Sequence, residues 1–278
     1  MTSARVLRLT HWVMVATVIT CVVAAGAWRL TGGRWERVET PSMGTVAPVN
    51  TLLWVEPVRF GDLRVGDIIT FHPPGDPSVT YSHRVAVVHE DGSVGTTGEI
   101  SAPDPWRLGP ADVVGRVVMR WQGVGWLVVA APILLVGVAV VLLLRRLSAT
   151  SWRLPVTIIG VSLVLSVAIV VHRPFVQAEK LGFAAAPGGA RASYVSTGLL
   201  PLRLRAHDGP YVDLRDGQVG SVLVTRKDST GRYGVTLHPH IPLWWWLLLV
   251  GGCFVPALWA AVVGVPNRPE PKRRATGS

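Results

Sequence analysis

Four long stretches without a charged residue constrain the fold of this chain more strongly than any other feature. Each comes close to, or exceeds, the roughly 20 apolar residues that an α-helix needs to cross a bilayer. Tryptophans stand at several of their ends, where interfacial side chains commonly lie. The sequence therefore predicts a membrane protein with about four transmembrane helices, over residues 12–28, 124–144, 154–171 and 241–265.

Basic residues beside these stretches predict their orientation. They lie before the first stretch, between the second and third, and after the fourth: Arg5 and Arg8; Arg145, Arg146 and Arg153; Lys272, Arg273 and Arg274. The positive-inside rule places all three groups in the cytoplasm, and four crossings satisfy this. The formal charge of +10 thus fits the lipid bilayer as a partner. Since no long basic stripe with interleaved aromatics occurs, nucleic acid is not expected to bind.

This topology gives a multi-pass protein of the cell membrane with two domains outside the cytoplasm. The expected parts are a cytoplasmic tip and anchor (1–31), a first outer domain (32–122), a helix (123–145), a cytoplasmic loop (146–153), a helix (154–172), a second outer domain (173–240), a helix (241–265) and a cytoplasmic tail (266–278). Ala25-Gly26-Ala27 also has the small-x-small pattern of a signal-peptide cleavage site. The first stretch is therefore either a retained anchor, which we favour, or a removable leader.

Both outer domains are expected to be rich in β-strands. Short runs of Val, Ile, Thr and Phe, separated by Gly-Asp and Asp-Gly turns, predict a small all-β fold for the first. Its expected strands cover residues 52–58, 67–72, 84–89, 93–97 and 112–121. The second domain has a similar composition but no residue-level repeat of the first, with expected strands over 194–206, 211–214, 220–225 and 233–237.

Cysteine and histidine usage predicts neither disulfides nor a metal. Cys21 and Cys253 both lie inside apolar stretches, so no disulfide framework is expected in the outer domains. No Cys/His grouping has the spacing of a zinc site, and His238 and His240 are too sparse to predict one. We expect no metal and no organic cofactor.

Ser42 and His83 are the residues that point most directly to a function. Ser42 stands in Thr40-Pro41-Ser42-Met43, shortly after the first apolar stretch, and His83 follows downstream. A serine hydroxyl becomes a nucleophile when a base takes its proton, and histidine is best suited to this near neutral pH. The pair predicts chemistry at the bilayer surface, which favours a retained anchor. His72 and His89 lie in expected strands without such a motif and are interpreted as structural.

Several short motifs follow one another in a fixed order. They are Ser42-Met43, Gly66-Asp67-Ile68-Ile69-Thr70-Phe71, His83-Arg84-Val85, Thr97-Gly98, Asp104-Pro105-Trp106 and Val113-Val114-Gly115-Arg116-Val117. In this order, behind a membrane anchor, they resemble the type I signal peptidases. The resemblance is to the branch that uses Ser and His, found in the endoplasmic reticulum, archaea and some Gram-positive bacteria, and it covers about residues 10–145. It implies a signal-peptidase-like β fold for the first outer domain.

The resemblance also implies a role for individual residues. Ser42 would be the nucleophile, and His83 the general base that later protonates the leaving amine. Asp104 would orient the imidazole. The backbone N–H of Ser42, with the hydroxyl of Thr40, would stabilise the tetrahedral oxyanion.

The chain departs from the family pattern at two places. Pro41 precedes the nucleophile where the family has Gly, and the proline that usually follows the nucleophile motif occurs only at Pro48. The family's Lys-Gly-Asp-x-Asn becomes Thr97-Gly98-Glu99-Ile100-Ser101, and the step from it to the Asp-Pro pair is one residue short. Glu99 is therefore an alternative orienter of His83, and Asp112 a third candidate.

These inferences predict a membrane-bound serine endopeptidase that removes signal peptides from exported preproteins after small residues. The substrate would lie extended along an edge strand, with shallow apolar pockets lined by the strands over 52–58 and 67–72. One alternative is a specialised peptidase for a few surface proteins, with residues 173–240 recruiting a dedicated client. Another is a catalytically inactive relative that serves binding or assembly. A transporter is not favoured, because the apolar stretches contain no Asp, Glu, Lys or Arg.

Overall fold

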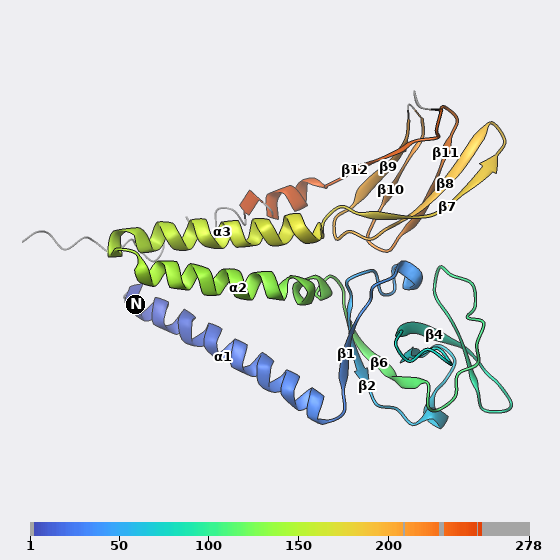
Figure 1. The fold of residues 1–278 in the computed structure, drawn as a ribbon, viewed down its shortest axis with the longest axis horizontal. Helices are drawn as coiled ribbons and strands as arrows, with labels where there is room; N and C mark the ends of the chain where they lie inside the picture. Colours follow the sequence, from blue (N-terminus) through green and yellow to red (C-terminus); the bar gives the residue numbers. More distant parts are fainter. Residues whose placement is uncertain (1–2, 208, 228–230, 249, 252–278) are drawn as a thin grey trace, which may run out of the picture. The chain divides into compact units, whose positions relative to one another are not determined.

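The computed structural model describes residues 3–207, 209–227, 231–248 and 250–251, and it combines antiparallel β-sheets with long apolar helices (Figure 1). The long helices are α1 (Ser3–Leu30), α2 (Gly125–Leu147) and α3 (Arg153–His172). Residues 28–241 form one compact unit that holds α2, α3 and two β domains.

The first β domain contains one six-stranded antiparallel sheet, in the order β1-β2-β6-β3-β4-β5. Its strands are β1 (Arg34–Arg37), β2 (Leu52–Glu56), β3 (Ile68–Phe71), β4 (Tyr81–Val88), β5 (Val94–Thr97) and β6 (Val113–Trp121). Short 3-10 helices occupy Pro41–Met43 and Phe60–Asp62. Burial alternates along β2, where Leu53 and Val55 are buried, as the period of two in a strand predicts. All four residues of β3 are buried, including Ile69 and Phe71.

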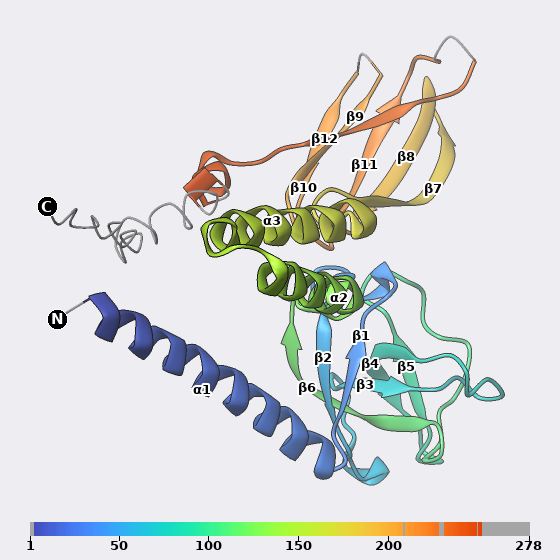
Figure 2. The ribbon, with the colours of Figure 1, turned by 60° about the vertical axis from the view of Figure 1, so that its left-hand side comes forward.

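The second β domain contains two three-stranded antiparallel sheets, β10-β9-β12 and β11-β8-β7 (Figure 2). Its strands are β7 (Ala178–Ala186), β8 (Gly189–Ser196), β9 (Leu202–Ala206), β10 (Tyr211–Leu214), β11 (Val219–Val224) and β12 (Val235–Pro239). One buried cluster joins residues of both sheets, including Ala192 of β8, Leu204 of β9 and Val222 of β11. The two sheets therefore share a core.

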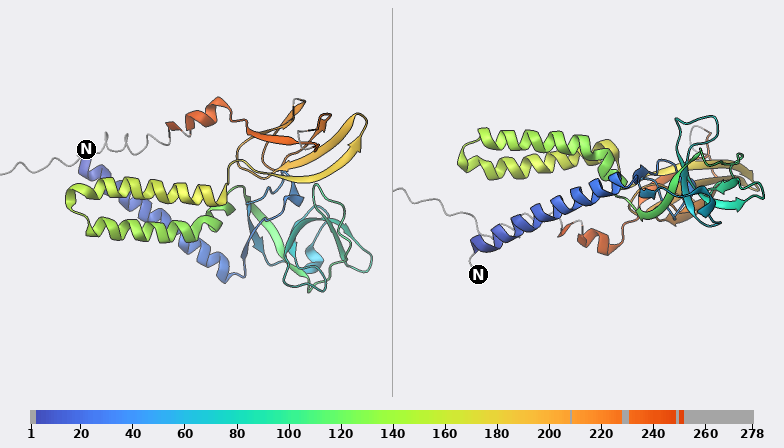
Figure 3. Two further views of the ribbon diagram at one scale, coloured as in Figure 1. Left: turned by 45° about the horizontal axis from the view of Figure 1, so that its top comes forward. Right: turned by 90° about the horizontal axis from the view of Figure 1, so that it is seen from below.

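Helices α2 and α3 lie side by side and antiparallel between the two β domains in sequence (Figure 3). Gly137 of α2 lies directly against Val164 of α3, and Gly160 of α3 against Val141 of α2. These small residues let the helix backbones approach closely, as they do between membrane helices. Among the described residues, two helices are long and apolar enough to cross a membrane, Gly125–Leu147 and Thr150–His172, and most of their side chains are exposed.

The expectation of four membrane helices is supported only in part. The two central stretches correspond to α2 and α3. The first lies within α1, whose apolar part, Val15–Leu30, is shorter than a membrane span. Most of the expected fourth helix, over 241–265, lies outside the described residues.

Expected and observed strands agree closely in the first β domain and less well in the second. All five expected strands of the first domain are present with small shifts, and β1 is an additional edge strand. In the second domain, the strand expected over 194–206 is wrong. Residues 197–201 leave the sheet between β8 and β9, at a segment with Gly198 and Pro201. The prediction also missed β7 and most of β8.

Candidate active site

Ser42 lies in a tight 3-10 turn, Pro41–Met43, directly after an extended residue, Thr40. Pro41 occupies the start of the turn, where its fixed φ fits and its missing N–H costs no hydrogen bond. The side chain of Met43 is buried in the domain core, and Gly44 ends the turn with a φ of 48°. Pro41 thus starts the turn that presents Ser42.

His83 lies on β4, and its imidazole is aimed at Ser42. The residue is 4% exposed, and its Nε2 atom lies 2.9 Å from the Ser42 Oγ atom. The register between β3 and β4 fixes the backbone position of His83, because His83 pairs with Ile69 on β3. The Pro41–Met43 turn and β4 are thus joined through Ser42 and His83, the two side chains that the sequence singled out.

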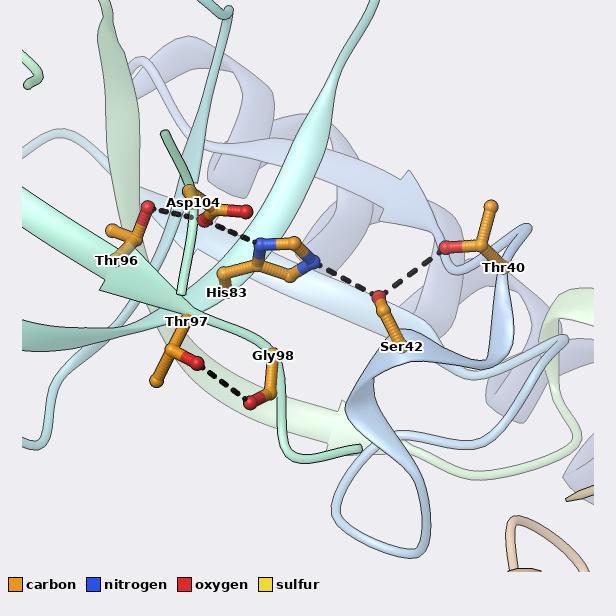
Figure 4. Close-up of polar contacts among 7 residues, drawn as sticks. All are labelled: Thr40, Ser42, His83, Thr96, Thr97, Gly98 and Asp104. Atoms are coloured by element: carbon orange, nitrogen blue, oxygen red, sulfur yellow. Dashed lines mark hydrogen bonds and ion pairs between the residues drawn. The ribbon is translucent and has the colours of Figure 1, made fainter. Parts of the chain in front are cut away.

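Asp104 completes a line of hydrogen bonds with these two residues (Figure 4). Its Oδ2 atom lies 2.7 Å from His83 Nδ1 and also accepts a hydrogen bond of 2.6 Å from the Thr96 hydroxyl. An ionised carboxylate only accepts, so Nδ1 carries the proton and Nε2 is free to accept from the Ser42 hydroxyl. This tautomer is the one that a general base at His83 requires.

The two alternative orienters of His83 have other partners. Glu99 accepts a hydrogen bond of 2.7 Å from Arg84 Nε. Asp112 accepts one from the backbone N–H of Gly109. Neither carboxylate contacts His83, so of the three candidates the structure brings only Asp104 to the imidazole.

Aromatic rings surround the imidazole on its buried side. Phe71 meets the His83 ring edge-on at 6.1 Å between centroids. Tyr81 lies 5.6 Å from it and also contacts Trp106. Offset and edge contacts of this kind hold aromatic side chains in one orientation. The histidine therefore has a fixed position before any substrate binds.

Thr40 lies on the other side of Ser42. The two hydroxyl oxygens are 3.3 Å apart. Because Ser42 donates its proton to His83, Thr40 donates to the Ser42 oxygen. The structure thus places the Thr40 hydroxyl next to that of Ser42, and its role in stabilising an oxyanion stays a prediction.

The backbone around Ser42 is held by the loop that follows β5. The N–H of Ile100 donates to the Ser42 carbonyl oxygen at 3.0 Å. Gly98 passes so close that a Cβ there would lie 2.7 Å from the same oxygen. This loop carries Glu99 but supports Ser42 through its backbone, which sequence reasoning did not anticipate.

A cavity of about 540 Å³ opens beside Ser42. Two segments line it, residues 36–40 at the end of β1 and residues 78–82 at the start of β4. Many of the lining side chains are polar, among them Glu36, Glu39 and Thr80. Glu36 is half-buried, and its desolvation raises the pKa of the carboxyl, although Arg34 and other cations oppose this.

None of residues 52–58 and 67–72 lines the cavity beside Ser42. Leu53 and Val55 of β2 and all four residues of β3 are buried, whereas Trp54 and Val58 are half-buried. Apolar substrate pockets lined by these two segments stay a prediction. Apart from Thr40 and Ser42, the residues that line the cavity were not identified from the sequence.

Three other histidines contact groups outside this site. His72 Nδ1 lies 2.8 Å from the Val79 carbonyl oxygen. His238 contacts Thr236, and His240 lies 3.5 Å from an oxygen of Asp213. Within the described part of the chain, no group of three or more His, Cys, Asp or Glu side chains could hold a metal ion.

Thr96 is the member of this site that sequence reasoning missed. Its side chain is buried, and it binds the Asp104 oxygen that faces His83. The Asp104 N–H donates in turn to the Thr96 carbonyl oxygen at 2.9 Å. No signal in the sequence indicates this pairing, because it depends on how the chain after β5 folds back on the strand.

The arrangement has the parts needed for nucleophilic attack by a serine. A hydroxyl, a base in the required tautomer and an orienting carboxylate are aligned, next to an open cavity. Comparison with protein-family models and with curated proteins found no match to this chain.

Proposed function

We propose that this protein is a membrane-bound serine endopeptidase of the signal-peptidase type, which cleaves exported preproteins outside the cytoplasm. The observation that carries the proposal is the line of hydrogen bonds through Ser42, His83 and Asp104. Two helices of membrane length directly after the first β domain support a location at the bilayer. The motif series resembling the signal peptidases supports the choice of substrate.

In the proposed mechanism, His83 Nε2 takes the proton of Ser42 as the serine oxygen attacks the scissile carbonyl carbon. The carbonyl oxygen becomes an oxyanion, which the backbone N–H of Ser42 and the Thr40 hydroxyl stabilise. His83 then gives its proton to the leaving amine, and the signal peptide stays esterified to Ser42. Water attacks the ester with His83 again acting as base, which restores the free serine.

The cavity beside Ser42 gives this reaction a place for an extended substrate. Strand β1 is an edge strand of its sheet, and the residues that follow it line the cavity. A peptide lying there would add to the edge through backbone hydrogen bonds. Recognition through the backbone suits signal peptides, whose sequences vary.

A specialised peptidase is the second candidate, and the cavity lining favours it. A general signal peptidase needs apolar pockets for small side chains, whereas this cavity carries Glu36, Arg37 and Glu39. Charged groups reject most substrates unless the substrate supplies a partner. A dedicated client with polar or charged residues before the cleavage site, bound in addition by residues 173–240, would meet this requirement.

Cleavage by the purified full-length chain in detergent tests the proposal. The substrates are a preprotein with an Ala-x-Ala site and a peptide series with Lys or Glu near the site, with products mapped by mass spectrometry. We expect Ser42→Ala and His83→Gln to lower kcat by at least about 10³-fold. His89→Gln is the matched control and should retain full activity, since His89 does not contact Ser42.

The outcomes separate the candidates. Cleavage of both preprotein and peptides that requires Ser42 supports the general enzyme, and cleavage of charged peptides alone supports the specialised one. Cleavage that persists in Ser42→Ala contradicts the proposed site. If wild type and variants are all inactive on every substrate, the chain serves binding or assembly instead.

A further inference from the structure

The segment that follows the nucleophile, residues 44–47, is held by contacts from outside its own turn. Gln122 donates to the Thr45 carbonyl oxygen at 3.3 Å, and Arg120 donates to the Val46 carbonyl oxygen at 3.2 Å. Both donors lie at the end of β6 or just after it. The segment has no regular secondary structure beyond the turn, so its position depends on such contacts.

The second β domain contributes a contact to the same segment. Gly217, in the turn between β10 and β11, is buried and has a φ of 73°. A Cβ at Gly217 would overlap the Gly44 carbonyl oxygen and lie 2.8 Å from the Thr45 Cα atom. The two backbones therefore touch directly, two residues after Ser42.

A second contact with the first β domain comes from Leu199, in the loop between β8 and β9 of the second β domain. Leu199 packs on Gly123, where a Cβ would lie 2.6 Å from the leucine Cδ2 atom. The Gly217 N–H donates to the Ser196 carbonyl oxygen at 2.9 Å, and the Ser196 N–H donates to the Gln218 carbonyl oxygen at 3.0 Å. These bonds tie the β10–β11 turn to the end of β8, where the loop carrying Leu199 begins.

Asp216, next to Gly217, has the burial expected of a covered turn. Its Oδ1 atom is buried and has no hydrogen-bond partner among the described residues. A carboxylate at the tip of a free turn would keep its oxygens in water, because burying an unpaired charge is costly. Gly217 and one oxygen of Asp216 are therefore covered in this arrangement, whereas Arg215 and Gln218 of the same turn are exposed.

We propose that the β10–β11 turn, residues 215–218, is a positioning element of the active site that the second β domain supplies. It presses on Gly44 and keeps Ser42 aligned with His83, so that full activity requires the second β domain to be docked. This inference rests on the proposed peptidase function. It assigns the second β domain a role in the rate of cleavage, separate from any role in binding clients.

The geometry of Gly44 explains why support at this point matters. Its φ of 48° and ψ of −133° are conformations that glycine reaches easily and that leave the backbone free to change. The hydrogen bond between Ser42 Oγ and His83 Nε2 depends on where this turn ends. A displacement of about 1 Å at a reacting group is enough to lower a rate by about 100-fold.

Two matched glycine variants of the full-length protein test the proposal. Gly217→Ala adds a methyl group that pushes against Gly44. Gly188→Ala is the control, because Gly188 has a similar φ of 80° in the same domain but nothing within 4 Å of its added Cβ. Because the two φ values are similar, both variants carry comparable backbone strain, and the contact with Gly44 is the main difference between them. We expect Gly217→Ala to lower kcat by about 10- to 100-fold with little change in KM, and Gly188→Ala to leave both unchanged.

Hydrogen exchange gives a second result that does not need cleavage. The amides of Gly44, Val46 and Ala47 are bonded within the nucleophile turn. They should exchange faster in Gly217→Ala than in wild type, and at the wild-type rate in Gly188→Ala. Leu199→Ala, which removes a docking contact without a clash, should act in the same direction, with the exposed Leu181→Ala as its control.

Three outcomes distinguish a positioning role of the β10–β11 turn from its absence. Faster exchange together with a lower kcat, in Gly217→Ala and Leu199→Ala but not in their controls, supports the proposal. Unchanged exchange, or faster exchange with an unchanged kcat, overturns it. If the wild type cleaves nothing, the peptidase function fails and the catalytic role of the turn fails with it. The exchange comparison then still shows whether the second β domain holds the nucleophile turn.

Discussion

At the scale of single residues, the tautomer and orientation of His83 depend on Asp104. The carboxylate holds the proton on Nδ1 and leaves Nε2 facing Ser42. In Asp104→Asn, the amide can donate to Nδ1 and so favour the wrong tautomer, which lowers kcat by about 10²- to 10⁴-fold. Steady-state kinetics on a peptide substrate would measure this.

Glu99→Gln is the control for that experiment. Glu99 pairs with Arg84 and does not contact His83. Its kcat should stay within about threefold of wild type, because a partly exposed ion pair contributes little. A greater loss in Glu99→Gln than in Asp104→Asn would show that the wrong carboxylate has been assigned.

Asp216 predicts how the stability of the protein changes with pH. Burial raises the pKa of Asp216 to about 7, compared with about 3.9 for an unfolded aspartate. The folded state therefore binds more protons than the unfolded state between these values, and stability falls as the pH rises from about 4 to about 7. Asp216→Asn removes this loss, so its melting temperature should exceed that of wild type at pH 8 but not at pH 4.

Asp91→Asn serves as the comparison in the same thermal melts. Hydrogen bonds from Ser93 lower the pKa of Asp91 in an exposed turn, the opposite direction from Asp216. Its carboxylate stabilises the fold above its unfolded pKa, and the benefit is lost as the pH falls through its folded pKa. Asp91→Asn should therefore not gain stability at pH 8. Equal responses of the two variants to pH would contradict the assignment to Asp216.

Sequence patterns could predict the site's serine and histidine but not its complete geometry. Ser42 and His83 stand in short motifs that can be recognised from the sequence without knowing the fold. Three acids were candidates for the third position, and only the fold of the chain after β5 separates Asp104 from Glu99 and Asp112. Thr96 has no motif at all, since its role arises from a backbone contact with Asp104.

At the scale of secondary-structure elements, the loop after β5 packs closely against the Pro41–Met43 turn. A Cβ at Gly98 would lie 2.7 Å from the Ser42 carbonyl oxygen. Gly98→Ala should displace the turn and lower kcat by about 10-fold or more, while the sheet remains folded. Kinetics combined with circular dichroism would separate the two effects.

Gly61→Ala is the matched control for Gly98→Ala. Gly61 lies in the same domain, has nothing within 4 Å of an added Cβ and does not have a positive φ. It should retain activity and melt at the wild-type temperature or slightly above, because alanine restricts the unfolded chain. If both variants lose activity equally, the close approach of Gly98 to Ser42 has no special role.

Elements with typical strand composition could be predicted from the sequence, and the atypical ones could not. β3 and β6 are rich in Val, Ile and Phe and were expected close to their observed bounds. β7 contains Ala, Glu and Lys, which are depleted in strands, and it forms because it pairs along its length with β8. β1 is a charged edge strand that only its pairing with β2 defines.

At the scale of the whole molecule, the pairing of α2 with α3 restricts where the β domains lie. If both helices cross the bilayer, as proposed, the antiparallel pair returns the chain to the side from which it left. The two β domains then lie on one side of the bilayer and the α2–α3 connection on the other, whether or not α1 crosses it. This argument does not require four membrane helices, whereas the sequence-based topology did.

Cysteine labelling in intact cells would test this topology. The background is Cys21→Ser with Cys253→Ser, and three single cysteines are introduced at exposed sites: Glu90→Cys, Ala149→Cys and Thr225→Cys. A membrane-impermeant maleimide should label Glu90→Cys and Thr225→Cys from outside, because they lie in the first and second β domains. Ala149→Cys lies between α2 and α3 and should react only after permeabilisation. The charges near it, Arg145, Arg146 and Arg153, place this connection in the cytoplasm by the positive-inside rule. Labelling of Ala149→Cys from outside would place the α2–α3 connection outside the cell. Different accessibility of Glu90→Cys and Thr225→Cys would be incompatible with a β10–β11 turn that supports Ser42.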